Sequence, residues 1–131
     1  MPETSLRPRI AVVDDDAMFR DMAYQWLSFS FNDRVLAFGD GHSAWEYMKN
    51  SDSADIVVSD VNMPEMSGFD LVSRIKHQYP EKICILVSGN PENAIAARQL
   101  GADGFMAKPF SMRQLVSTLN DLYSGRRERA A

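Results

Sequence analysis

The sequence has one cysteine and no long apolar run. A single thiol cannot form an intramolecular disulfide or a multi-cysteine metal site, so Cys84, in the apolar run 83–87, is interpreted as a small buried hydrophobic residue in a reducing compartment. No segment approaches the roughly 18 apolar residues of a membrane helix, and residues 1–8 lack the apolar core of a signal peptide. We therefore expect a soluble, cytoplasmic protein without membrane insertion.

Positive charge is also scarce. The 14 Lys and Arg residues are outnumbered by 18 Asp and Glu, and the formal net charge of −4 provides no broad cationic field, which disfavours direct nucleic-acid binding. What is present is ordinary globular composition: 131 residues, 45% of them hydrophobic, are enough for one domain with its own core. We expect this domain to span residues 9–123, after an N-terminal extension at 1–8. Residues 124–131 are interpreted as a C-terminal tail or the start of a linker.

Short apolar runs alternate with amphipathic segments along the chain. The runs predict strands at 10–13, 35–38, 56–59, 83–87 and 104–107. The amphipathic segments predict a first helix after Asp16, with helical spacing from Phe19 to Phe29 or Ser30, and further helices at 43–50, 68–78, 92–100 and 112–123. In the first helix, Asp16 is the expected cap, and the spacing of Phe19, Met22, Ala23 and Trp26 predicts the core-facing side. Five strand–helix units favour a parallel sheet covered on both faces, which is a three-layer α/β sandwich.

Polar side chains collect where the predicted strands end. The first strand is followed by Asp14 and Asp15, the third ends at Asp60, the fourth at Ser88 and the fifth at Lys108. Because parallel strands bring their carboxyl ends to one edge of the sheet, where such folds bind ligands, we expect these five side chains to converge.

Three neighbouring carboxylates repel one another unless a cation lies among them. The candidate ligands are all oxygens, which favours a hard divalent ion such as Mg²⁺ over zinc. Lys108 and the hydroxyl of Ser88 add a cation and a hydrogen-bond donor of the kind that phosphoryl oxygens require. The sequence therefore predicts an anion site built around Mg²⁺.

Four motifs resemble the receiver domain of bacterial two-component response regulators, and in particular its chemotaxis-regulator-like members. They are Val-Val-Asp-Asp-Asp at 12–16, Ser-Asp-Val-Asn-Met-Pro-Glu-Met-Ser-Gly at 59–68, Leu-Val-Ser-Gly at 86–89 and Lys-Pro-Phe at 108–110. Their order and strand-end positions match that family over residues 9–123. The resemblance implies a flavodoxin-like sheet of strand order 2-1-3-4-5 with five helices.

The resemblance also implies roles for the residues at the strand ends. Asp60 would be the phosphoacceptor, taking a phosphoryl group from a phosphohistidine of a histidine kinase or a histidine phosphotransfer protein. The Mg²⁺, for which Mn²⁺ can substitute, would be held by Asp14, Asp15, Asp60 and the backbone carbonyl of Asn62. Lys108 would pair with the phosphoryl oxygens.

Further positions follow from the same resemblance. Ser88 and Phe105 occupy the switch positions of the family, although Thr and Tyr are common there. Lys108-Pro109 is a candidate cis peptide bond. Asn62 and Asn90, two residues beyond Asp60 and Ser88, are expected to tune the lifetime of the aspartyl phosphate. The implied function is phosphorelay signal transduction by a phosphoprotein that catalyses only its own phosphotransfer and dephosphorylation.

The expected signal is a change of conformation on the face formed by the fourth helix, fifth strand and fifth helix, which would contact a downstream partner or output domain. Two other functions compete. An aspartyl-phosphate phosphatase would need a second carboxylate two residues after Asp60, where this chain has Asn62. A flavodoxin-like FMN carrier would need a first loop that receives phosphate, which the acidic run 14–16 would repel without a metal.

Overall fold

The computed structural model describes residues 8–31, 34–50 and 53–130, and it confirms the alternation of strands and helices. All but the last residue of the predicted N-terminal extension lie outside this described part. The strands are β1 (Ile10–Val13), β2 (Val35–Phe38), β3 (Ile56–Asp60), β4 (Ile83–Ser88) and β5 (Gly104–Ala107). The helices are α1 (Ala17–Ser30), α2 (Gly41–Met48), α3 (Gly68–Gln78), α4 (Asn93–Gln99) and α5 (Met112–Ala130). None of these helices combines the length and apolar content that a membrane crossing requires.

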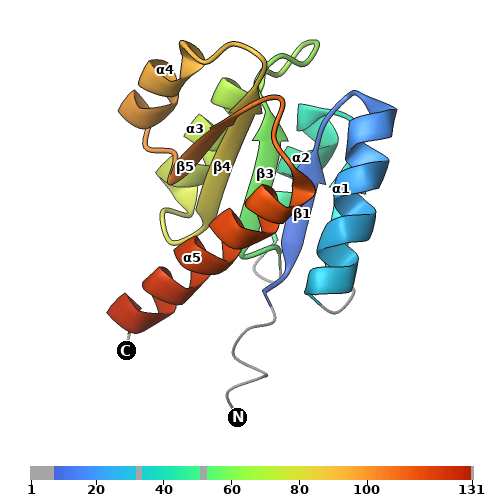
Figure 1. Cartoon of the computed structure of the whole chain (residues 1–131). Coiled ribbons are helices and arrows are strands. Elements are labelled where there is room, and N and C mark those ends of the chain that lie inside the picture. The colour runs from blue at the N-terminus through green and yellow to red at the C-terminus, as the bar shows by residue number, and fades with distance from the viewer. Residues whose placement is uncertain (1–7, 32–33, 51–52, 131) are drawn as a thin grey trace.

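The five strands form one parallel sheet in the order β2-β1-β3-β4-β5, as expected (Figure 1). The register keeps the strand ends level. Val13 lies opposite Ser59, and Asp60 lies opposite Val87. The residues that follow β1, β3 and β4 therefore reach the same edge of the sheet.

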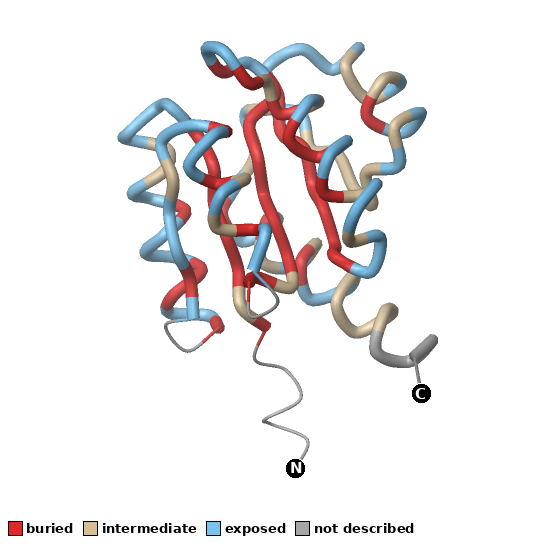
Figure 2. Tube along the Cα trace, turned by 180° about the vertical axis from the view of Figure 1, so that it is seen from behind, coloured by how far each residue is buried: buried red, intermediate tan, exposed pale blue. Residues whose placement is uncertain are grey.

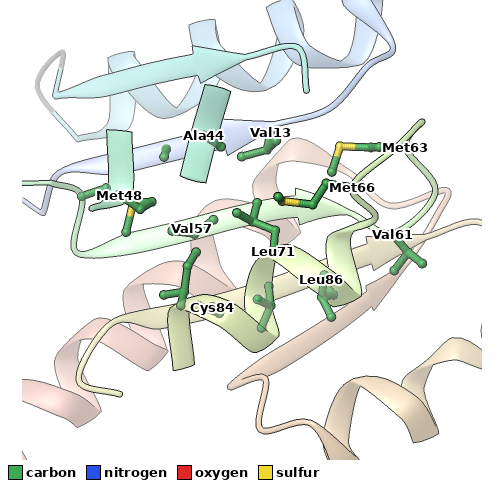
Figure 3. Packing of buried hydrophobic residues seen from close by; sticks show 14 of the residues in the cluster. Val13, Ala44, Met48, Val57, Val61, Met63, Met66, Leu71, Cys84 and Leu86 are labelled. Atoms are coloured by element: carbon green, nitrogen blue, oxygen red, sulfur yellow. The ribbon is translucent and has the colours of Figure 1, made fainter. Parts of the chain in front are cut away.

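Alternate side chains of the sheet enter two separate cores. Ile10, Val12 and Ile85 pack with α1 and α5, whereas Cys84 and Leu86 pack with α2, α3 and α4 (Figure 3). The near-continuous burial of the central strands between partly exposed helices follows from this arrangement (Figure 2). The observed fold is thus the predicted three-layer sandwich, with α1 and α5 on one face and α2, α3 and α4 on the other.

The inward face predicted for α1 is wrong in part. Ala23 and Leu27 are fully buried, but Met22 and Trp26 are each 44% exposed and Phe29 is 89% exposed. Apolar residues cover much of the helix circumference, while the buried residues of α1 are Ala23, Leu27 and Ser28. Met22 and Trp26 instead line a shallow hollow between α1 and the start of α5.

The predicted end of the last helix at residue 123 is also wrong, since α5 continues to Ala130. The apolar period stops because the last turns pass beyond the sheet, but residues there still favour helix. Arg126 also ties this part of α5 to the domain, because its guanidinium donates to the carbonyl of Glu81 and pairs with Asp103 at 3.2 Å.

Asp103 lies in the loop before β5, at the sheet end opposite the acidic residues. Besides the pairing with Arg126, its carboxylate accepts hydrogen bonds from Lys76 Nζ at 2.9 Å and from the backbone N–H of Cys84 at 2.8 Å. One side chain thereby joins α3, β4 and α5 to the start of β5.

Candidate functional site

Three carboxylates meet at the carboxyl ends of β1 and β3. Oxygens of Asp14, Asp15 and Asp60 lie within 4.8 Å of one another. Asp14 is 1% exposed and Asp60 is 9% exposed, whereas Asp15 is open to solvent. Asp14 and Asp60 thus form the buried part of the cluster, and Asp15 forms its solvent-accessible side. The positions of the three residues at neighbouring strand ends predict that their carboxylates converge.

Lys108 supplies the positive charge of the cluster. Its Nζ lies 3.2 Å from Asp14 Oδ2 and 3.4 Å from Asp60 Oδ1. The Lys108-Pro109 peptide bond is cis, as anticipated, and the Lys108 N–H donates to the Ser88 carbonyl at 2.8 Å. The ammonium also lies 4.3 Å from the centre of the Phe19 ring, which packs edge-to-face against Phe110. These contacts hold the lysine over the carboxylates.

The charges of the cluster perturb one another. Burial raises the pKa of Asp60, and the negative charge of Asp14 raises it further, against the opposing effect of Lys108. Burial alone would lower the pKa of Lys108, but Asp14 and Asp60 outweigh it and raise that pKa. One lysine facing three carboxylates leaves an excess of negative charge that a cation can neutralise.

The donor set fits a hard divalent ion. Asp14 is oriented through both oxygens, since Oδ1 accepts from the N–H of Asp16 at 2.9 Å and Oδ2 accepts from Lys108. Carboxylate oxygens within 4.8 Å and an exposed side are compatible with Mg²⁺, which keeps several waters when it binds proteins. Asn62, whose carbonyl is the fourth predicted ligand, lies on the exposed loop after β3.

Gly68 fixes the loop that follows Asp60, a role that the sequence motifs did not assign to it. A Cβ on Gly68 would lie 2.1 Å from the carbonyl oxygen of Asp60, which is possible only for a residue without a side chain. The Gly68 N–H donates to the Val61 carbonyl at 2.8 Å, and the Val61 N–H donates to Val87 at 2.9 Å. The start of α3 is thereby pressed against the end of β3.

Ser88 lies fully buried at the end of β4. Its Oγ accepts hydrogen bonds from the Asn90 N–H at 3.0 Å and from Asn93 Nδ2 at 2.9 Å. The sequence analysis did not single out Asn93, because its partner is set by how α4 is placed. Asn90 is exposed, and its side-chain oxygen accepts from the Glu92 N–H. The predicted switch hydroxyl is therefore bound to the segment that begins α4.

Phe105 does not join the carboxylate cluster. It is paired with Leu86 in the sheet and lines a hollow with Ala94, Ala97 and Arg98 of α4. The aromatic ring is half-buried there, on the face that α4 and β5 share.

Residues 10–120 match the family described as the response regulator receiver domain. The chain belongs to this family. The receiver domain is 30% identical over 118 residues to a chemotaxis protein CheY homolog of Campylobacter jejuni, covering 87% of this chain and 91% of that protein. It is 44% identical over 86 residues to the sensor kinase CckA of Brucella abortus, covering 63% of this chain and 9% of that kinase.

Among solved structures, the receiver domain resembles Vibrio cholerae chemotaxis protein CheY4. The two share 29% sequence identity and superpose with a TM-score of 0.77, covering 86% of this chain and 95% of the other. The fold and the four motifs thus agree with membership of the response regulator receiver domain family.

Proposed function

We propose that this receiver domain accepts a phosphoryl group on Asp60 from the phosphohistidine of a histidine kinase or a histidine phosphotransfer protein. The observation that carries the proposal is the position of Asp60, largely buried at a strand end between two acidic residues and within 3.4 Å of Lys108. A carboxylate in this position can act as a nucleophile. The ammonium of Lys108 can then neutralise charge on the phosphoryl group that Asp60 acquires.

The reaction requires positioning rather than a general base. An ionised oxygen of Asp60 forms a bond to phosphorus while the bond from phosphorus to the histidine nitrogen breaks; the electron pair stays on that nitrogen, which takes up a proton. Lys108 neutralises charge on the phosphoryl oxygens, and Ser88 can donate its hydroxyl proton to one of them. We propose that the domain catalyses only its own phosphotransfer and dephosphorylation.

The cation of this site is proposed to be Mg²⁺, for which Mn²⁺ can substitute. Asp14, Asp15, Asp60 and the backbone carbonyl of Asn62 would hold it. When bound, it would neutralise charge on the reacting phosphoryl group. Asp14 is already oriented by Asp16 and Lys108, so little side-chain order remains to be gained on binding.

Two asparagines are proposed to set the lifetime of the phosphorylated state. Asn62 and Asn90 are both exposed, in the loops that follow Asp60 and Ser88. An amide at such a position can orient the water that hydrolyses the acyl phosphate.

The output surface is proposed to be the face of α4, β5 and α5, which would contact a downstream partner or output domain. Phe105 supports this assignment because it lies half-buried against α4, where a shift of the helix alters its exposure. The buried free thiol of Cys84 is consistent with a reducing compartment, and we propose a cytoplasmic location.

Phosphorylation by a small donor tests the proposal. With Mg²⁺ and acetyl phosphate or phosphoramidate, intact-mass spectrometry should show one added phosphoryl group on the parent and none on Asp60→Asn. Asp121→Asn, which makes the same change at an exposed position of α5, should be labelled like the parent. Equal labelling of Asp60→Asn, or full labelling in EDTA, would contradict the assignment.

A further inference from the structure

Helix α4 is short and has little buried surface. It is seven residues long, and Ala97 is its only buried residue among those that the structure describes. Its N-cap residue, Glu92, makes no side-chain capping hydrogen bond. Because a short helix without a cap is marginal, the start of α4 depends on contacts from outside the helix.

The first N–H groups of α4 donate to backbone carbonyls of the turn before the helix, and the side-chain contact at this point is to the hydroxyl of Ser88. Asn93, the first residue of α4, donates from Nδ2 to Ser88 Oγ at 2.9 Å. Asn90 donates its N–H to the same oxygen at 3.0 Å, and its own side chain accepts from the Glu92 N–H. The first turn of α4 is thereby linked to the end of β4 through one oxygen atom.

These bonds use both acceptor positions of the hydroxyl. Only its proton remains, and no residue in the described part of the chain accepts it. Two donors also restrict the Ser88 side chain to the rotamer that directs Oγ toward α4.

The sheet places Ser88 and Asp60 on different sides. Ser88 alternates with Leu86 and Cys84, which face α2, α3 and α4. Asp60 pairs with Val87, which faces α1 and α5. To donate its proton to a phosphoryl oxygen on Asp60, the Ser88 hydroxyl has to turn away from Asn93.

We propose that Asn93 is a positioning residue that holds Ser88 against α4, so that a phosphoryl group on Asp60 and the start of α4 compete for the same hydroxyl. This inference rests on the proposed function of Asp60. Phosphorylation would withdraw the hydroxyl from Asn93 and so free the first turn of α4. Removing the side-chain amide of Asn93 would abolish one of the hydrogen bonds with which the phosphoryl group has to compete for Ser88.

The test is the affinity for beryllofluoride, a phosphoryl mimic, titrated in the presence of Mg²⁺ and followed by tryptophan fluorescence. Loss of one hydrogen bond that favours the unmodified state should tighten binding by about 2- to 12-fold in Asn93→Ala. Asn93→Leu, which keeps the size of the side chain without its donor, should bind equally tightly. Gln99→Ala, at the exposed end of the same helix, controls for helix propensity and should bind like the parent.

Hydrogen exchange adds a readout that affinity alone does not give. Without the mimic, the amides at the start of α4 should exchange faster in Asn93→Ala than in the parent, and addition of the mimic should change them less. In a Ser88→Ala background, Asn93→Ala should leave mimic affinity unchanged, because the competing hydroxyl is gone.

The inference is overturned if Asn93→Ala binds the mimic no more tightly than the parent, or if its effect persists in the Ser88→Ala background. In either case the parent still binds, and the role of Asp60 stands. A parent that binds no mimic in the presence of Mg²⁺ would overturn the proposed function and this inference with it.

Discussion

At the scale of single residues, Lys108 is the cation that offsets the repulsion among the carboxylates of Asp14, Asp15 and Asp60 in the unliganded protein. Asp14 is almost fully buried, and Lys108 is paired with both it and Asp60. Lys108→Ala should lower the free energy of unfolding by about 1–3 kcal/mol, because two charged side chains lose a hydrogen-bonded partner. Added Mg²⁺ should restore much of this loss, since the carboxylates remain able to bind it.

Urea unfolding of the parent and of Lys108→Ala, with Mg²⁺ and with EDTA, measures this effect. Lys49→Ala is the matched control, because the exposed pair of Lys49 with Glu46 should contribute little. The same Lys108 variant should bind Mg²⁺ but fail to change its amide spectrum with beryllofluoride. A variant that responds normally to the mimic would remove Lys108 from the proposed role.

At the scale of elements, the junction of β3 and α3 depends on the absence of a side chain at position 68. Gly68→Ala should lower the free energy of unfolding by about 1–3 kcal/mol or more, because a Cβ 2.1 Å from the Asp60 carbonyl oxygen forces backbone to move. It should also slow phosphorylation by displacing Asp60. Gly125→Ala, within α5 and with no atom in the way, should instead stabilise by up to about 1 kcal/mol. Urea unfolding that ranks the two variants in the opposite order would contradict this reading.

Helix α1 shows what a sequence pattern can and cannot specify at this scale. The apolar spacing predicted a helix, and the Asp16 cap was found, with its carboxylate accepting from the Met18 N–H at 3.0 Å. The pattern did not specify which apolar row faces the sheet, because Met22 and Trp26 lie next to the row that does. The row that faces the sheet contains Ala23, a small residue that is fully buried and permits close packing of the helix.

At the scale of the whole molecule, the position of the site was predictable and its internal contacts were not. Asp14, Asp60 and Lys108 meet because parallel strands end at one edge, which the alternation of strands and helices already implies. The roles of Gly68 and Asn93 depend on how neighbouring elements pack, and no local pattern encodes that.

The reactivity of the buried Cys84 thiol is a measure of global unfolding. Burial raises the pKa of this thiol from 9.0 to about 12, and the residue lies in β4, an interior strand of the sheet. At pH 8 the folded protein then has far less thiolate than the unfolded chain, so alkylation by iodoacetamide should follow the rate and extent of unfolding. Because the unfolded thiol ionises near 9.0, the free energy of unfolding should decline as the pH rises from 9 toward 12. Mass spectrometry showing rapid alkylation in native buffer, at the rate seen in denaturing urea, would contradict this expectation.

The carboxylate of Asp103 holds several elements together at one edge of the sheet. It joins α3, β4 and α5 to the start of β5 at the edge away from Asp60, whereas at the other edge the side-chain contact of Asn93 at the start of α4 is to the hydroxyl of Ser88. The two edges of the sheet are therefore held to different degrees. We expect a change at Asp60 to displace the start of α4 next to Ser88, while the hydrogen bonds of Asp103 keep α3, β4 and α5 in place at the opposite edge.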